Sequence, residues 1–410
     1  MSNFTTSPSE AILTPRDVRQ KASDALKAFQ RRESKIVGSL RQEFFRKKSA
    51  SEYARSQTSK KGTLDVNKLH AYKYDDDIFQ SVTRVQDAKN HGLFFLLDFS
   101  RSMNNALPSV CRHLLRLILF CEAVGIPYEA YGFTTKLVTR DHGTSGKGQI
   151  NSGHLKIFQL IRSDAPKDVI TRAKEDLLLI NGESALSEGE ELQLTPLTEA
   201  LIVANKLVKR FKQKHNIEVP NFVLFSDGYG NGQISVRSGE SQAGAFRTSS
   251  TYHGKLCGRY VTIRGGDIVD GKSVVRNIRE TCGANTLCYF LTNDSSRAGK
   301  KMKREKLKEL EYEHNINPKT VSNELKKNQN FWSGEDILGF DRYVIIDDIS
   351  YSTHNESLKD RQCSSSKISD IKNDFIGYTK AKKGDKLFVR TFVDTIAEKP
   401  RATKTKRRRR

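Results

Sequence analysis

The sequence is poor in the features that mark several large classes of protein. No apolar run in its 410 residues approaches the roughly 18 residues of a membrane span, which excludes an integral membrane protein and predicts no membrane partner. The six cysteines form no Cys-x-x-Cys pair, so we expect no zinc module and interpret them as reduced thiols. The opening residues, MSNFTTSPSE, lack the charged and apolar regions of a signal peptide. These absences predict a cytoplasmic protein.

Common catalytic motifs are also missing. The sequence has no G-x-x-x-x-G-K-[ST] loop, so we expect no ATP binding by that route. Its nine histidines include no H-E-x-x-H pattern, and Ser226-Asp227-Gly228 lacks the G-x-S-x-G elbow of a serine hydrolase. We therefore predict no catalytic residues, and expect a non-catalytic subunit more than an enzyme.

Acidic residues are too few to balance the basic ones. Lys and Arg number 70 against 48 for Asp and Glu, a formal charge of +22. Seven basic residues fall in the last ten positions, RATKTKRRRR, which we predict to be disordered. Arg407, Arg408, Arg409 and Arg410 could bind nucleic acid or an acidic partner through charge, or could serve only as a solubilising terminus. No RNA-binding aromatic motif or helix-turn-helix pattern accompanies this charge.

The pattern along the chain predicts four regions. Residues 1–90 read as a basic helical arm and lead-in, with a helix over 14–58 whose few apolar positions favour an arm over a core element. Residues 91–294 form the expected main domain, with an insertion at about 229–271. Residues 295–400 read as a basic helical linker and a small C-terminal region containing strands, and residues 401–410 as the tail.

The main domain alternates buried strands with helices. Short apolar runs without polar alternation are typical of strands buried on both faces of a parallel sheet. We predict strands at 93–98, 126–133, 221–228 and 286–294, helices at 107–125, 155–161, 168–180 and 197–215, a β-ribbon at 259–269, and further β-runs at 342–348 and 386–393. This order predicts an α/β fold with a doubly wound, mainly parallel sheet.

Hard oxygen ligands follow three of the expected strand ends or helix starts. Asp98, Ser100 and Ser102 form a D-x-S-x-S loop after the first strand, Thr195 opens a helix, and Asp227 ends the LFSDG strand. Ligands of open α/β sheets bind beyond the carboxyl ends of the strands, so the five side chains are expected to meet there. Each has a simpler reading: a helix cap for the serines and the threonine, and an ordinary turn for Asp227.

Together these oxygens favour Mg²⁺ or Mn²⁺. The three hydroxyls could bind the ion in octahedral geometry, with the carboxylates supplying charge directly or through water. Hydroxyl ligands are neutral, so the metal would stay electrophilic and could accept a carboxylate from another chain. This chemistry predicts a binding switch and not a hydrolytic centre.

The order DFSRS, TPL and SDG resembles the metal-ion-dependent adhesion site of the von Willebrand factor A (VWA) family over roughly residues 91–294. The resemblance implies a VWA fold with Mg²⁺ at Asp98, Ser100, Ser102, Thr195 and Asp227. Arg101 stands where that family usually has Gly.

Further segments are similar to CobT, the large subunit of aerobic cobaltochelatase, and to compact CobT-like proteins of large tailed bacteriophages. They are KKGTLDVNKLHAYKYDDDIFQSV, YEAYGFTTK and HLKIFQLIRSDAP. This likeness implies a MoxR/CobS-type AAA+ ATPase as partner, and the cytoplasm of a bacterial host if the chain is phage-encoded. A genuine cobalt or magnesium chelatase subunit of cobalamin biosynthesis, and a nucleic-acid-associated protein, stay open as alternatives.

Overall fold

The structure is a computed structural model of the whole chain. The residues it describes are 15–55, 57–59, 82–84, 90–135, 155–180, 195–228, 234–237, 246–249, 251–256, 259–264, 271–292, 297–328, 331–347, 391–392 and 395. The predicted tail, 401–410, and the four arginines within it lie outside these residues.

A seven-stranded mixed sheet forms the centre of the protein, in the order β12-β13-β11-β6-β3-β4-β5. The five inner strands are parallel, and the two edge strands, β5 and β12, are antiparallel to their neighbours. The strand bounds in chain order are β3 His91–Asp98, β4 Tyr128–Thr135, β5 Leu155–Arg162, β6 Val219–Ser226, β11 Asn285–Thr292, β12 Phe331–Ile337 and β13 Phe340–Asp347. The sheet confirms the predicted α/β, mostly parallel architecture.

The sheet is buried on both faces because its side chains alternate between two apolar layers. In β3, Leu93, Phe95 and Leu97 belong to one core cluster, whereas Phe94 and Leu96 belong to the other. This explains why the strand reads as an unbroken apolar run in the sequence.

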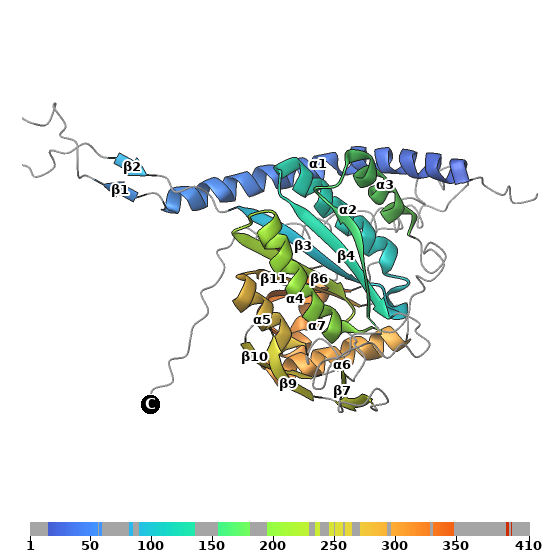
Figure 1. Cartoon of the computed structure of the whole chain (residues 1–410), viewed down its shortest axis with the longest axis vertical. Coiled ribbons are helices and arrows are strands. Elements are labelled where there is room, and N and C mark those ends of the chain that lie inside the picture. Colours follow the sequence, from blue (N-terminus) through green and yellow to red (C-terminus); the bar gives the residue numbers. More distant parts are fainter. Residues whose placement is uncertain are drawn as a thin grey trace, which may run out of the picture.

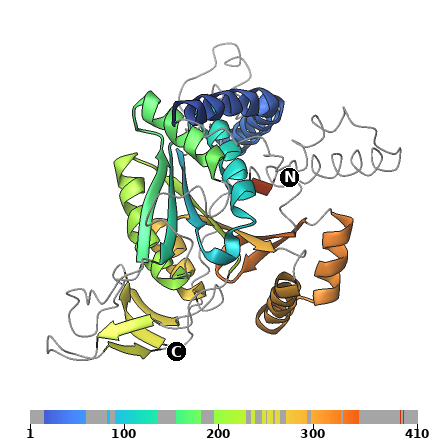
Figure 2. The same cartoon turned by 90° about the vertical axis from the view of Figure 1, so that its right-hand side faces the viewer.

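Helices cover both layers (Figures 1 and 2). On the first face lie α1 (Pro15–Arg55), α2 (Leu107–Val124) and α3 (Lys167–Leu179). The other face is covered by α4 (Leu197–Lys214), α5 (Lys272–Cys282), α6 (Arg297–His314) and α7 (Pro318–Lys327). No helix in the described part of the chain combines the length and the apolar character that a membrane crossing requires.

Helix α1 corrects one expectation from the sequence. The predicted helix is confirmed, but its reading as an arm outside the core is wrong. Phe29, Leu40 and Phe44 are buried, and α1 runs alongside α2 and α3 (Figure 1). Glu33 adds a buried ion pair with Arg116 of α2. A sparse apolar stripe is sufficient here because its buried residues pack against the apolar residues of α2 and α3.

Two secondary-structure predictions are also wrong. Residues 155–161, predicted as a helix, form edge strand β5, because hydrogen bonding to β4 overrides the helical spacing of the apolar residues. Of the β-run predicted at 386–393, Thr391 and Phe392 are helical, and 386–390 and 393 lie outside the described residues. Phe392 is buried against Phe95 and Phe120, so it belongs to the core of the first face.

The predicted domain boundary at residue 294 cuts through one sheet and is wrong. Strand β13 pairs in parallel with β11, and β12 pairs with β13, so residues 331–347 extend the main sheet. Elsewhere, short antiparallel pairs join β1 (Gln57–Ser59) to β2 (Val82–Arg84), β7 (Ile234–Arg237) to β8 (Phe246–Ser249), and β9 (Thr251–Leu256) to β10 (Arg259–Arg264). Residues 259–264 of the predicted β-ribbon form strand β10, whose partner is β9 at 251–256, and residues 265–269 lie outside the described residues.

Candidate metal centre

The sheet changes its direction of growth between β3 and β6. From β3 the chain adds β4 and then β5 on one side, and it then returns to place β6, β11 and β13 on the other. Counting these six strands in chain order gives the doubly wound order 3-2-1-4-5-6. The two strands that flank the reversal are parallel and level, with Leu97 opposite Phe225. Their carboxyl ends therefore meet at one edge, where ligands of such sheets bind.

Asp98 ends β3 at this edge and is completely buried. Its Oδ1 accepts a hydrogen bond from the Ser100 backbone N–H at 2.9 Å. Its Oδ2 accepts one from the Ser226 hydroxyl at 2.7 Å. The Ser226 hydroxyl in turn accepts a hydrogen bond from the Gly228 backbone N–H at 2.9 Å. These contacts hold the DFSRS loop to the end of β6.

Asp227 brings a second buried carboxyl group to the same place. Burial, followed by the negative charge of Asp227, raises the pKa of Asp98 well above its usual value, although hydrogen bonds from Ser226 and Ser100 act in the opposite direction. Two adjacent carboxylates with little access to water repel each other, and a cation between them would relieve that repulsion. The pair thus has the electrostatics of a cation site.

The two serines of the loop lie beside each other. A short 3₁₀ turn, η2 (Arg101–Met103), follows Ser100, whose side chain makes no capping hydrogen bond to it. Instead the Ser100 and Ser102 hydroxyls share a hydrogen bond at 3.1 Å. Ser100 is buried, whereas Ser102 and Arg101 are exposed. The hydroxyl pair therefore lies between the buried carboxylates and solvent, and the cap reading of Ser100 is not supported.

Aromatic packing fixes the position of this loop. Phe99 is buried, its backbone N–H donates to the Phe133 carbonyl at 2.9 Å, and its ring packs edge-on against Phe158 with centroids 5.0 Å apart. A Cβ at Gly132 of β4 would lie 2.5 Å from the Phe158 ring and 2.9 Å from the Phe99 ring. Only glycine therefore fits at this position of β4. The loop is anchored on the side away from solvent.

Thr195 is buried just before α4. Helix α4 ends near the start of β6, and its 18 residues span about 27 Å, close to the length of the eight-residue strands. Its first turn, next to Thr195, therefore lies at the carboxyl edge of the sheet. The cap position of α4 is Pro196, and it makes no side-chain cap bond. Among the described residues, no hydrogen bond joins Thr195 to the other four predicted ligands.

The five predicted ligands are thus not all brought together by the same kind of observation. Contacts and charge unite Asp98, Ser100, Ser102 and Asp227, whereas Thr195 is placed at the same edge by the path of α4 alone. Carboxylate and hydroxyl oxygens are the hard donors that Mg²⁺ and Mn²⁺ prefer, so the residues present fit such an ion.

Sequence reasoning missed another group of ligand-type residues. Glu129, Asp164 and His215 lie close together although they are distant in the sequence. No motif spacing connects them, and a single histidine at a helix end carries no signal of its own. Only the pairing of β4 with β5 and the path of α4 bring them to one place.

Comparisons with known proteins identify no family. No protein-family model and no curated protein matches the chain. Two crystal structures of the pilus adhesin SpaC from Lactobacillus rhamnosus GG, one of them in an open conformation, are similar to it at 12% identity, with TM-scores of 0.31 and 0.32. Each match covers 54% of this chain and 27% of the adhesin chain. A likeness this weak indicates neither a family nor a function.

Proposed function

We propose that the protein is a VWA-type adaptor that binds Mg²⁺ at Asp98, Ser100, Ser102, Thr195 and Asp227 and uses the ion to hold a carboxylate of a partner protein. One observation carries the proposal. Two buried carboxyl groups, Asp98 and Asp227, lie together at the switch point of the sheet, with the Ser100–Ser102 hydroxyl pair on their solvent side.

The arrangement suits a binding switch. A divalent cation would neutralise the two carboxylates, and the serine hydroxyls would occupy coordination positions without adding charge. Because Ser102 is exposed, the ion would keep a side open to an incoming ligand. A carboxylate from another chain is the hard, negatively charged ligand that such an ion prefers. Mn²⁺ would serve in the same way.

The partner we propose is a MoxR/CobS-type AAA+ ATPase. The proposal rests on the resemblance of the sequence to CobT and on the lack of a Walker A loop, which leaves nucleotide chemistry to another subunit. In this arrangement the ATPase performs the work, and the present chain docks through its metal and transmits a conformational change.

The test is Mg²⁺-dependent binding of the full-length chain to a purified ATPase of this type from the same genome neighbourhood. We expect a complex in Mg²⁺ that dissociates in EDTA and is lost with Asp98→Ala. Asp176→Ala is the matched control, because Asp176 is an exposed aspartate of α3 and is not one of the proposed ligands. Equal binding in EDTA, or by Asp98→Ala, would contradict the proposal.

One observation favours a nucleic-acid-associated protein as a second candidate: the net charge of +22. Binding through phosphate contacts would weaken steeply with salt and with removal of residues 401–410. A flat salt response would exclude this candidate. The chelatase alternative rests on the sequence resemblance alone, and tetrapyrrole metal insertion by the assembled subunits would be its test.

A further inference from the structure

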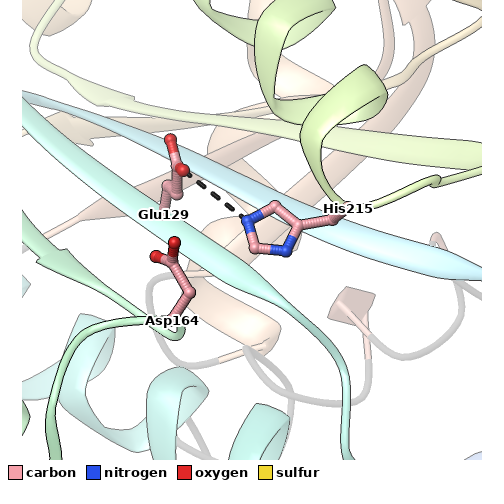
Figure 3. A group of neighbouring side chains, drawn as sticks. All are labelled: Glu129, Asp164 and His215. Atoms are coloured by element: carbon pink, nitrogen blue, oxygen red, sulfur yellow. Dashed lines mark ion pairs between the residues drawn. The ribbon is translucent and has the colours of Figure 1, made fainter.

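A second group of metal-ligand side chains lies at the opposite edge of the sheet. Glu129 is the second residue of β4, Asp164 follows β5, and His215 is the C-cap of α4. Ligand atoms of the three lie within 4.8 Å of one another, and Figure 3 shows their side chains directed into one space. Glu129 is level with Phe94, four residues before Asp98, so the two sites are at least about 13 Å apart along the strands.

The histidine nitrogen is placed as a ligand. His215 Nε2 is buried and has no hydrogen-bond partner in the described part of the chain. It lies 3.7 Å from Glu129 Oε1, too far for a hydrogen bond (Figure 3). Two ligands of one tetrahedral Zn²⁺ ion are separated by roughly 3.4 Å, given Zn–N and Zn–O bonds near 2 Å. A zinc ion between these two atoms requires little movement.

Glu129 is oriented for this role by a neighbouring phenol. The Tyr131 hydroxyl donates to Glu129 Oε2 at 2.9 Å, which leaves Oε1 directed toward His215. Tyr131 is itself held by hydrogen bonds from Gln159 at 3.0 Å and Arg210 at 3.2 Å. Carboxylate ligands of metal sites are commonly fixed in this way by hydrogen bonds to their outer oxygen. Glu129 is only 2% exposed, so its orientation is also set by packing.

A cation already occupies the space between the carboxylates. Lys214 Nζ lies 2.6 Å from Asp164 Oδ2 and 3.3 Å from Glu129 Oε1. Arg162 adds a weaker contact to Asp164 Oδ1 at 3.5 Å. The Lys214 side chain is 36% exposed on a flexible stem, so it can swing into solvent when a metal binds. Two carboxylates then neutralise a divalent ion, and the C-terminus of α4 favours positive charge at this position.

We propose that Glu129, Asp164 and His215 form a Zn²⁺ site, with water as the fourth ligand and Lys214 as the cation that zinc displaces. Imidazole nitrogen and carboxylate oxygen are both zinc ligands, and three protein ligands leave a fourth position open to water. This donor set favours zinc over Mg²⁺, whose preferred ligands are all oxygens. The site is independent of the proposed Mg²⁺ centre.

The test is zinc titration of the full-length chain against a chromophoric zinc-selective chelator, in excess Mg²⁺ so that the proposed Mg²⁺ centre is filled. Cys257→Ser with Cys363→Ser is the background, because the remaining four thiols are buried. We expect one zinc ion per chain, and at least about tenfold weaker binding in His215→Gln, since even outer hydrogen-bond partners of zinc ligands contribute ten- to hundredfold. Lys214→Met should bind zinc about threefold or more tightly, because it removes a competing positive charge.

Matched controls separate this site from others. His113→Gln and Lys209→Met, which change a half-buried histidine and an exposed lysine elsewhere, should bind zinc like the background protein. Co²⁺ should give the visible d–d bands of a tetrahedral site without a thiolate charge-transfer band. Zinc affinity that is unchanged in His215→Gln, or no zinc binding at all, would overturn the proposal.

Discussion

Replacing Glu33 with alanine should destabilise the whole protein, because this residue forms a buried ion pair between α1 and α2. Arg116 Nε lies 2.6 Å from Glu33 Oε2, and Arg116 Nη2 donates to Glu33 Oε1 at 3.1 Å. The two side chains are 3% and 6% exposed for Glu33 and Arg116. Glu33→Ala would remove the buried carboxylate that pairs with the guanidinium. Breaking such a pair from one side costs about 3–5 kcal/mol.

The assay is urea unfolding followed by tryptophan fluorescence. The chain has a single tryptophan, Trp332, which is 7% exposed on β12 and packs in the layer opposite α1. A shift of its unfolding midpoint, with an unchanged slope, would therefore report that α1 and the sheet unfold together. Glu33→Leu combined with Arg116→Met should recover most of the lost stability, since an apolar pair replaces the ionic one.

Glu43→Ala is the matched control on the same helix. Glu43 pairs with Lys47 at 3.8 Å in a more exposed position, so its loss should cost about 1 kcal/mol or less. The reasoning would be refuted if Glu33→Ala lowered the free energy of unfolding no more than Glu43→Ala does, or if it left the unfolding midpoint of Trp332 fluorescence unchanged. Either result would mean that α1 does not stabilise the sheet.

Three further predictions concern other parts of the fold. Gly339→Ala should lower the free energy of unfolding by at least about 1 kcal/mol in the same urea assay, because Gly339 has φ +87° and a Cβ there would lie 2.7 Å from the Lys272 carbonyl oxygen. An unchanged free energy of unfolding would contradict this prediction. The native protein should expose no more than two thiols to a disulfide reagent at pH 8, because four of its six cysteines are buried and burial raises the pKa of Cys111 to about 12. Fast reaction of a third thiol would contradict the burial of these four cysteines. Asp164→Asn should make stability fall less steeply in acid. Partial burial raises the pKa of Asp164, but the hydrogen bond and charge of Lys214 outweigh it and lower that pKa, so the carboxylate stabilises the fold above the ordinary carboxyl pKa and this contribution is lost as pH falls through the lowered value. An unchanged dependence of stability on pH in the acid range would refute this prediction.

The sequence predicts the elements that build the site because their signals are local. The apolar run before Asp98, the Thr195-Pro196 helix start and the apolar run before Asp227 each identify an element and its end. The rule that ligands bind at the carboxyl edge of an open α/β sheet then brings the residues together. The contact between Asp98 and Ser226 depends on the register of β3 and β6, and the hydrogen bond shared by the two loop serines depends on the backbone of the loop. Neither could be read from these signals.

The remaining errors arise where distant parts of the chain decide the structure. Strand β5 has helical apolar spacing, and only its pairing with β4 makes it a strand. The sparse stripe of α1 is buried because α2 and α3 supply the partner surface. The Glu129, Asp164 and His215 group is assembled by the same long-range packing. The spacing of residues within one segment of the sequence does not show which distant strand or helix that segment will pack against.

The most direct test of the central claim is anomalous diffraction from crystals of the full-length protein grown with Mn²⁺ in place of Mg²⁺. We predict an anomalous peak at the carboxyl edge between β3 and β6, bonded to the Ser100 and Ser102 hydroxyls, with Asp98, Asp227 and Thr195 contacting the ion directly or through water. A chain with no manganese between these residues at saturating Mn²⁺, or with the ion held by other side chains, would contradict the account.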